Sequence, residues 1–210
     1  RVASAIKIGF VEGESIDKII RRVRGTRSQQ FRDGALEINR RGAQGVVRTA
    51  ISHTANVARQ ETYKANEDVI KGERYTATRD TRTSAVCISL DGQVFPLGVG
   101  PRPPQHYGGC RSTTVPVLKS WKELGIDLKE APEGTRASMS GQVPASTTYG
   151  EWLKNQPKDV QEDVLGVAKA KLFRDGGLSV DKFVDRTGSE LNLSELRAKE
   201  ASAFKKAGID

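Results

Sequence analysis

The chain is poor in the residue types that most often form cross-links or reactive centres. Its 210 residues include two cysteines, two histidines, one methionine and two tryptophans. Two cysteines are too few for a disulfide scaffold, so a thiol pair near a histidine indicates a metal site or a packed core before it indicates a cross-link. The sequence also has no run of 18 apolar residues and no signal-peptide pattern. It therefore predicts neither membrane insertion nor secretion.

Several short motifs with a known mechanism are missing too. The sequence contains no G-x-x-x-x-G-K-[ST] phosphate-binding loop, no G-x-S-x-G nucleophile turn and no H-E-x-x-H zinc-binding helix. Coiled-coil heptads, internal repeats and low-complexity tracts are absent as well. The chain therefore carries no signature of a nucleotide hydrolase, an α/β-hydrolase or a metalloprotease.

What is present is a polar chain that can still bury a core. Hydrophobic residues make up 36% and charged residues 29% of the sequence, and the mean hydropathy is -0.51. The length suits one domain, or one domain with an appendage. The chain begins at Arg1 instead of a methionine, and we expect that an N-terminal portion precedes it.

Basic residues are concentrated in the N-terminal part. Residues 1–82 hold 17 Lys and Arg against 10 Asp and Glu, a net charge of +7, whereas the remainder holds 17 against 16. Such an excess favours a polyanion, because cationic side chains displace counterions from phosphates. No aromatic residues are interleaved with the basic run, so base stacking is not indicated. We expect non-specific phosphate contacts, with solvated helix faces as the alternative, from Lys18, Arg21, Arg22, Arg24, Arg27, Arg40 and Arg41.

Helical spacing dominates the N-terminal part. Apolar residues follow Ser15 at helical intervals up to Gly25, which predicts a short capped helix followed by a basic loop over 26–34. A second, longer helix is predicted from a cap at Asn39 to about residue 66. Two glycines near its start, Gly42 and Gly45, indicate a close approach of another backbone or a frayed first turn. His53 on this helix is expected to be packed or solvent-facing and not functional.

Residues 75–117 contain both cysteines and a cluster of proline and glycine. Alternating or β-branched residues predict three short strands, at 75–78, around Val94 and Phe95, and at 112–117. A long loop over 98–109 separates the last two strands and needs a restraint if it is to be ordered. The candidates for that restraint are Cys87, His106 and Cys110.

These three residues support more than one chemistry. They form a partial zinc site, because structural zinc takes four nitrogen or sulfur ligands, and Asp80, Asp91 or a water would have to complete the set. The alternatives are buried thiols or a disulfide between the two cysteines. A catalytic interpretation makes His106 a general base, an aspartate its orienting partner and a cysteine the nucleophile. A Pro-Pro-x-His loop between glycines is equally well explained as a rigid structural turn, and Arg82 and Arg111 are expected to pair with Asp80 or Asp91.

The C-terminal part is again mainly helical. A short helix over 118–124 with Trp121 is expected to close the core, and a segment rich in Pro, Gly, Ser and Thr then predicts a linker. Thr148 and Glu151 form a capping-box pattern, and Pro157 can start a further helix that ends at the paired glycines 176 and 177. A turn between two extended pieces is predicted over 178–193. Ser194 is expected to cap the last helix.

The motif in the middle of the chain resembles a known family. The pattern D-x-R-T-S-x-x-C-x-x-L-D-G-x-V-F, followed by P-P-x-H-x-x-x-C-R-S-T-T-V-P-V, is similar to the signature of Mu F-like minor head proteins of tailed bacteriophages. The resemblance extends upstream through residues 48–66 and more loosely into the C-terminal part. In family members that carry further cysteines in this motif, the corresponding places are held here by Ser84 and Ser112. The motif residues are Asp80, Arg82, Thr83, Asp91, Gly92, Pro103, Pro104, His106, Cys110 and Arg111.

The resemblance implies a function for the whole chain. We expect a non-enzymatic minor capsid protein that takes part in head morphogenesis, with the portal protein, other head proteins and double-stranded DNA as partners. It would lie inside the virion head near the portal vertex, be present in the host cytoplasm during assembly, and leave with the genome at DNA ejection. The alternative is an enzyme, a nuclease or transferase-type toxin domain that uses Asp80, Cys87, His106 and Cys110.

The expected fold class is α+β, mainly helical with a small antiparallel sheet that carries the motif. We predict a basic helical arm over residues 1–74 and a motif core over 75–125. A linker over 126–147 and a helical region over 148–210 follow. No cofactor is required by this interpretation apart from zinc, if the cysteines and His106 bind it.

Overall fold

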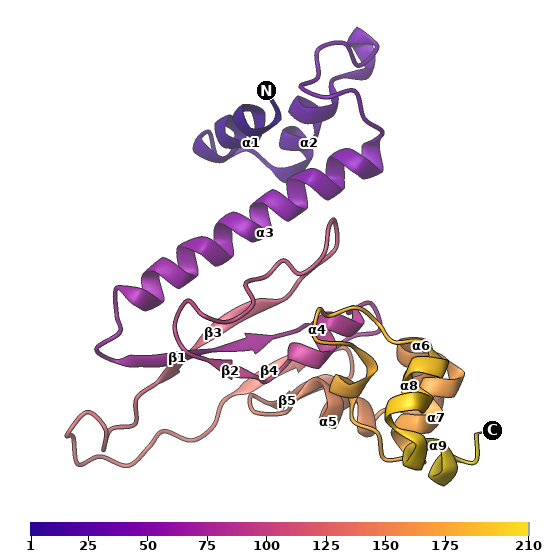
Figure 1. The fold of residues 1–210 in the computed structure, drawn as a ribbon. Helices are drawn as coiled ribbons and strands as arrows, with labels where there is room; N and C mark the ends of the chain where they lie inside the picture. The colour runs from indigo at the N-terminus through magenta and orange to yellow at the C-terminus, as the bar shows by residue number, and fades with distance from the viewer. Residues whose placement is uncertain (210) are drawn as a thin grey trace. The chain divides into compact units, whose positions relative to one another are not determined.

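A computed structural model describes residues 1–209 of the chain. It confirms an α+β fold in which helices predominate and the sheets are small and antiparallel (Figure 1). The chain divides into two compact units. The first comprises residues 1–59 and 102–111, and the second comprises residues 60–101 and 112 onward.

The first unit is built on three helices. Helix α1 spans Val2–Val11, α2 spans Ile16–Arg24 and α3 spans Arg40–Lys64, whose last turn from Gln60 belongs to the second unit. A 3-10 turn, η1, follows α2 at Arg27–Gln29. The apolar faces of α1, α2 and α3 meet in one core that contains Ile6, Ile19, Ile20, Val23, Ala43 and Val47. The predicted helices and their borders are therefore confirmed in this unit.

Local contacts explain where these helices begin and end. The Ser15 hydroxyl accepts a hydrogen bond from the Lys18 N–H, and Gly25 ends α2 with a backbone φ of 92°. At the start of α3 the side chain of Asn39 accepts a hydrogen bond from the Gly42 N–H. Each cap satisfies a backbone donor that the first helical turn would otherwise leave without a partner.

The second unit contains a three-stranded sheet, but the predicted bounds of its first strand, 75–78, are wrong. That strand begins at Ile70, inside the segment predicted as a helical arm, and ends at Thr76. Strand β1 (Ile70–Thr76) lies between β2 (Val94–Phe95) and β3 (Thr113–Leu118), and both neighbours are antiparallel to it. The register pairs Arg74 with Val94 on one side and with Val115 on the other. Helix α4 (Ala85–Leu90), which the sequence pattern did not predict, connects β1 to β2.

The end of α3 covers one face of this sheet. Tyr63 is buried and its hydroxyl donates to the Thr114 carbonyl at 3.0 Å. The Gln60 side-chain N–H group donates to both oxygens of Glu73, which is 1% exposed. The Gly98 N–H also donates to Glu73, so this buried carboxylate joins the helix, the sheet and the loop after β2.

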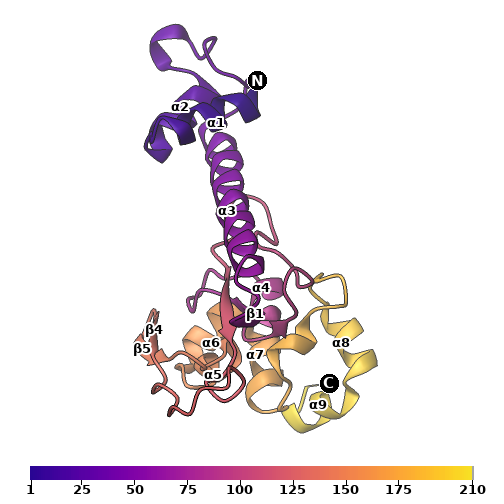
Figure 2. The same cartoon turned by 90° about the vertical axis from the view of Figure 1, so that its left-hand side faces the viewer.

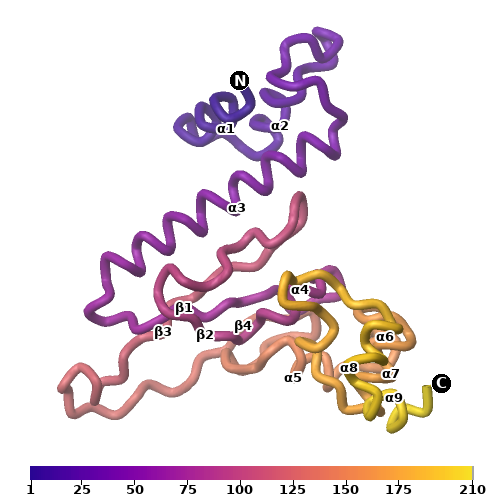
Figure 3. Tube along the Cα trace, in the orientation of Figure 1, coloured from indigo at the N-terminus to yellow at the C-terminus, as the bar shows by residue number. Residues whose placement is uncertain are grey.

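The segment between β3 and the C-terminal helices differs from the prediction in two places. The expected helix over 118–124 is wrong, because Leu118 ends β3 and only hydrogen-bonded turns follow, with Trp121 37% exposed. Within the predicted linker the chain forms a two-stranded hairpin, β4 (Thr135–Ser138) and β5 (Gly141–Pro144). Figure 3 shows the chain leaving β3 in a long excursion before it returns at β4.

The C-terminal helices complete the second unit. They are α5 (Tyr149–Lys154), α6 (Lys158–Leu165), α7 (Val167–Arg174), the 3-10 turn η2 (Val180–Phe183), α8 (Leu193–Lys199) and α9 (Ala201–Ala207). Figure 2 shows α8 and α9 beside α7. The capping box of Thr148 and Glu151 is confirmed. Asn192, and not Ser194, caps the helix that follows, because its side chain accepts from the Glu195 N–H.

Apolar contacts hold these helices together. Leu172, Leu178, Phe183, Leu196 and Phe204 form the buried core of the C-terminal helices. A second cluster joins α4 to α5 through Ile88, Tyr149, Trp152 and Leu153. Within the described residues, no helix is both long enough and apolar enough to cross a membrane.

Candidate nucleic-acid interface and metal ligands

The net charges of the two units differ more than those of residues 1–82 and the remainder of the sequence. The first unit holds 14 Lys and Arg against 5 Asp and Glu, a net charge of +9, and the second holds 20 against 21, a net charge of -1. The net positive charge of the chain therefore comes entirely from the first unit. All seven residues predicted to contact phosphates lie there, on α2, on η1 and at the start of α3.

One of these seven residues, Arg22, is engaged within the protein. Arg22 forms ion pairs with Glu12 and with Glu14, and its Nε lies 2.6 Å from a Glu14 carboxylate oxygen. The hydrogen bond from Arg22 lowers the pKa of Glu14, and the carboxylates raise the pKa of Arg22. Arg22 thus connects α2 to the segment that follows α1. It is a weaker candidate for a phosphate contact than its neighbours.

The other six candidates remain accessible. Arg24 is half-buried, and the remaining five side chains are exposed. The Arg24 guanidinium carbon lies 3.9 Å from the centre of the Phe31 ring, so the face of the guanidinium is stacked and its edge is left for hydrogen bonds. The sequence did not indicate this role for Phe31, because cation–π pairs carry no fixed spacing. The exposed candidates are Lys18, Arg21, Arg27, Arg40 and Arg41.

The loop that carries Phe31 has an unusual backbone. Gln30 and Phe31 both have positive φ values, 54° and 65°, which L-residues rarely adopt and which cost about 1–3 kcal/mol each. Asp33 closes this loop by accepting hydrogen bonds from the N–H and the hydroxyl of Thr26, at 2.8 and 2.7 Å. These hydrogen bonds hold the pKa of Asp33 below its usual value. The predicted loop is therefore an ordered turn.

Residues 102–111 pack along α3 within the first unit. The Tyr107 hydroxyl donates to the Gly42 carbonyl at 2.8 Å, and the Gly108 N–H donates to the Thr49 hydroxyl at 2.9 Å. A Cβ atom at Gly45 would lie 2.7 Å from the Tyr107 ring. Gly45 thus permits the close approach of this loop, whereas a Cβ atom at Gly42 would meet the Ile38 side chain instead.

Two of the three predicted metal ligands lie on this loop. His106 and Cys110 are both half-buried, and the Gln105 N–H donates to the Cys110 sulfur at 3.4 Å. The peptide bond between Pro103 and Pro104 is cis, and Pro103 is buried. Arg111, at the end of the loop, is exposed.

The third predicted ligand, Cys87, lies on α4 in the second unit. It is 1% exposed, and the Tyr75 hydroxyl lies 3.3 Å from its sulfur. Neither cysteine takes part in a disulfide. Of the three predicted ligands, His106 and Cys110 belong to the first unit and Cys87 belongs to the second.

The acidic motif residues have structural partners in the second unit. Asp91 is buried and accepts hydrogen bonds from the Ala77 N–H at 2.6 Å and from the Tyr149 N–H at 2.7 Å. It also forms ion pairs with Arg79 at 3.0 Å and with Arg136 at 3.7 Å. Burial lowers the pKa of Arg79, and the charge of Asp91 opposes that effect. Asp91 therefore joins the end of β1, the β4 strand and the start of α5.

Asp80 and Gly92 complete this arrangement. One oxygen of Asp80 accepts hydrogen bonds from the Arg82 N–H and the Thr83 hydroxyl, and its carboxylate lies 3.5 Å from the Arg82 guanidinium. The expected pairing of Arg82 with Asp80 is confirmed. The Gly92 φ of 85° shapes the predicted turn, and its N–H donates to the Tyr75 carbonyl. Sequence analysis missed Arg79 and Tyr149, because neither stands at a recognisable motif spacing from Asp91.

Comparison with known proteins relates the chain to a family. A family model described as Phage Mu protein F like protein matches residues 1–115, more than half of the chain. No curated protein and no solved structure matches the chain. The matched segment includes the basic helices, the three-stranded sheet up to Val115, and the motif from Asp80 to Arg111. The chain therefore belongs to the phage Mu protein F-like family, a family of phage head-related proteins.

Proposed function

We propose that this chain is a minor head protein that takes part in head morphogenesis, associates with the portal and the packaged DNA inside the head, and is ejected with the genome. The family match over residues 1–115 carries this proposal. The protein acts in the host cytoplasm during assembly and then resides in the virion.

Charge supports the DNA component of the proposal. The first unit carries a net charge of +9, and six of its basic candidates are not engaged by Glu12 or Glu14 in the way that Arg22 is. Arginine and lysine contacts to phosphates give affinity without sequence preference. We expect the first unit to face packaged double-stranded DNA.

The direct test uses particles of the virus or prophage that encodes the chain. Procapsids and mature heads are purified, and the chain is quantified by mass spectrometry against the major capsid protein. A minor head protein is present at a low copy number in both. Absence of the chain from both kinds of particle would overturn the proposal.

Two further comparisons test portal association and ejection separately. Procapsids assembled without the portal protein are expected to lack the chain, whereas retention in those particles contradicts portal association. Particles that have released their DNA are expected to have lost the chain. Retention in emptied particles contradicts ejection but leaves the head assignment intact.

We also propose that Cys87, His106 and Cys110 bind zinc as a structural ion. Two thiolates and an imidazole suit zinc, which takes four such ligands in structural sites. Asp91 does not suit the fourth position, because its oxygens already accept two backbone hydrogen bonds and pair with Arg79. Asp80 is similarly held by Thr83 and Arg82. The fourth ligand would be a water or another side chain.

Metal content tests this component. Zinc is measured in the purified full-length chain together with a thiol count under non-reducing conditions. About one zinc per chain, lost together with thermal stability in Cys110→Ser, is the expected result. No metal and two titratable thiols would overturn it.

No observation favours the enzyme alternative. Cys87 is 1% exposed, which removes it from an open cleft, and the Asp91 oxygens are occupied within the second unit. The proposal therefore assigns the motif a structural role and assigns it no substrate.

A further inference from the structure

The basic residues of the first unit surround a cavity next to the strained loop. This cavity measures about 610 Å³. Four arginines line it, Arg21 and Arg24 from α2, Arg27 from η1 and Arg40 from the first turn of α3. The hydroxyl-bearing residues Thr26 and Ser28 also line it, and Asp17 is its one acidic residue.

We infer that this four-arginine cavity is a built binding site for phosphate groups. This inference rests on the proposed function, and it names the residues and the geometry through which the first unit contacts phosphate. It differs from a diffuse basic surface because it requires particular side chains in particular places. The fold, and not the net charge, determines which side chains line the cavity.

Charge in the cavity is unbalanced in favour of an anion. Within the part of the chain that the structure describes, no carboxylate lies within ion-pair distance of Arg21, Arg24, Arg27 or Arg40. The Arg21 Nε donates to the Asp17 backbone carbonyl at 3.3 Å and not to its carboxylate. Four guanidinium groups that face one hollow repel each other, so an anion between them is stabilising.

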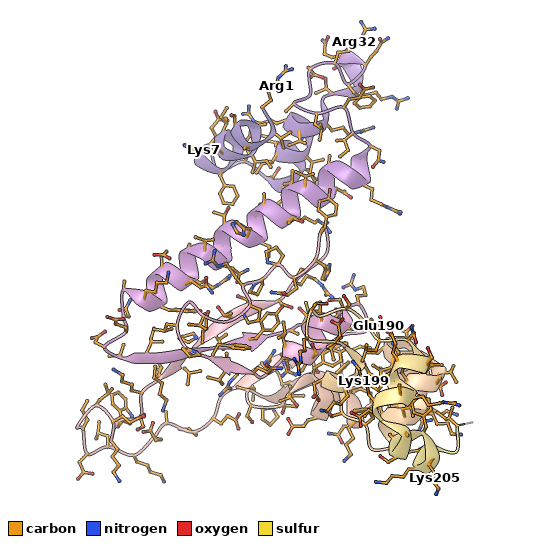
Figure 4. All side chains as sticks on the ribbon, viewed as in Figure 1. Arg1, Lys7, Arg32, Glu190, Lys199 and Lys205 are labelled. Carbon is orange, nitrogen blue, oxygen red and sulfur yellow. The ribbon has the colours of Figure 1, made fainter. Side chains whose placement is uncertain are left out.

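The Arg24–Phe31 stack fixes one wall of the cavity. A guanidinium stacked on a ring keeps its N–H edge free, and that edge matches two phosphate oxygens at once. The same two residues line a second hollow of about 720 Å³. Arg1 and Arg32, which are labelled near the N-terminal helices in Figure 4, also line this hollow. The stack therefore separates two arginine-bearing hollows. This arrangement suits a ligand with more than one phosphate.

The loop backbone is shaped to place Phe31 in that wall. Two successive residues with positive φ, Gln30 and Phe31, turn the ring back towards Arg24. Close approach at the base of the loop requires glycine, because a Cβ atom at Gly34 would lie 2.4 Å from the Arg24 carbonyl. Strained backbone of this kind persists where the surroundings demand it, and it is frequent at ligand sites.

The test measures binding of pyrophosphate to the full-length chain by calorimetry. The variant Arg27→Gln/Arg40→Gln removes two exposed cavity residues. Its control, Lys7→Gln/Arg48→Gln, removes the same charge from exposed residues of the same unit that neither line the cavity nor belong to the seven predicted phosphate contacts. We expect roughly tenfold weaker binding in the cavity variant and about twofold or less in the control. Equal losses in both variants, or no binding by the unaltered chain, would overturn the inference.

A second variant keeps the charge and removes the geometry. Arg24→Lys retains one positive charge but loses the planar fork and the stacking on Phe31. We expect pyrophosphate binding to weaken about threefold or more, with an unchanged circular dichroism spectrum. Unchanged affinity in Arg24→Lys would show that net charge alone acts, and would contradict a built site.

Competition with DNA identifies the source of the phosphate. If pyrophosphate displaces a short DNA duplex, and the cavity variant binds that duplex more weakly than the control, the site takes backbone phosphates. If pyrophosphate binds without displacing DNA, the site takes a free polyphosphate. If the chain binds pyrophosphate at the cavity but binds no DNA, the proposed DNA contact fails while the cavity assignment stands.

Discussion

The two units of this chain use charged side chains in opposite ways. In the second unit, acidic and basic residues are nearly equal in number and many are paired, as in Arg79 with Asp91 and Lys169 with Glu190. The first unit contains 14 basic and 5 acidic residues, and four of its arginines line one cavity. Ion pairs join parts of the fold in the second unit, whereas the first unit carries the basic excess on which the proposed DNA contact depends.

The comparison shows that net charge alone does not identify the arginines that can bind a phosphate. Arg22 and Arg24 are two residues apart on α2 and look equivalent in the sequence. Arg22 is paired with Glu12 and Glu14, whereas Arg24 stacks on Phe31 and faces two hollows. Only the fold separates an arginine that holds helices together from one that can hold a phosphate.

The largest expected effect lies in the second unit, at Asp91. Replacing it with asparagine leaves the Arg79 guanidinium buried without its counter-charge, and we expect a loss of about 3–5 kcal/mol in the free energy of unfolding. Urea denaturation of the full chain measures it. Arg82→Met, which breaks the exposed pair with Asp80, is the control and should cost less than about 1 kcal/mol. Similar costs for the two variants would contradict an internal role for charge in this unit.

A smaller effect is expected in the first unit at Gly45. Its replacement by alanine places a methyl group 2.7 Å from the Tyr107 ring, and we expect a loss of about 1–3 kcal/mol. In a Tyr107→Ala background the same change should instead stabilise the protein, because alanine favours helix by about 1 kcal/mol over glycine. Thermal unfolding of the four proteins tests this cycle. If the effects of the two substitutions on stability are additive, the packing of Tyr107 does not require glycine at position 45.

The smallest expected effect concerns Glu123 in the second unit. Hydrogen bonds from Lys71 and Ser120 lower the pKa of Glu123 to about 2. Because the folded pKa lies below the unfolded value, the stabilisation is present above about pH 4.5 and is lost as the pH falls towards 2. Carboxylate titration by nuclear magnetic resonance should give a pKa near 2, and Lys71→Met should raise it. A pKa in the ordinary range in the unaltered chain would contradict the pairing.

Local patterns predicted much of this fold. The caps at Ser15, Asn39 and Thr148 were evident because each lies directly before a helical apolar pattern. The second and third strands followed from the turn at Gly92 and a β-branched run, whereas the first strand begins at Ile70, five residues before its predicted start. Helix α4 was missed, because six residues are too few to show a helical period. Trp121 suggested a core residue, but it is 37% exposed.

The candidate site was harder to predict from the sequence. Basic residues could be named by their clustering, but their convergence depends on a loop whose two positive φ values follow no sequence rule. Asp91 was placed near a metal by its position in the motif. In the fold it bonds to residues as distant in sequence as Tyr149, and such long-range contacts carry no local signal.

The most direct test of the account is the salt dependence of DNA binding by the full chain. A plot of log affinity against log salt should have a slope of about -3 to -6, since each phosphate contact contributes about -0.9. Neutralising Arg21, Arg24, Arg27 and Arg40 to glutamine should reduce that slope by roughly 3. Neutralising four exposed lysines of the second unit, Lys122, Lys129, Lys205 and Lys206, should change it by less than about 1. Equal reductions in the two variants would contradict the claim that the first unit alone offers its charge to a partner.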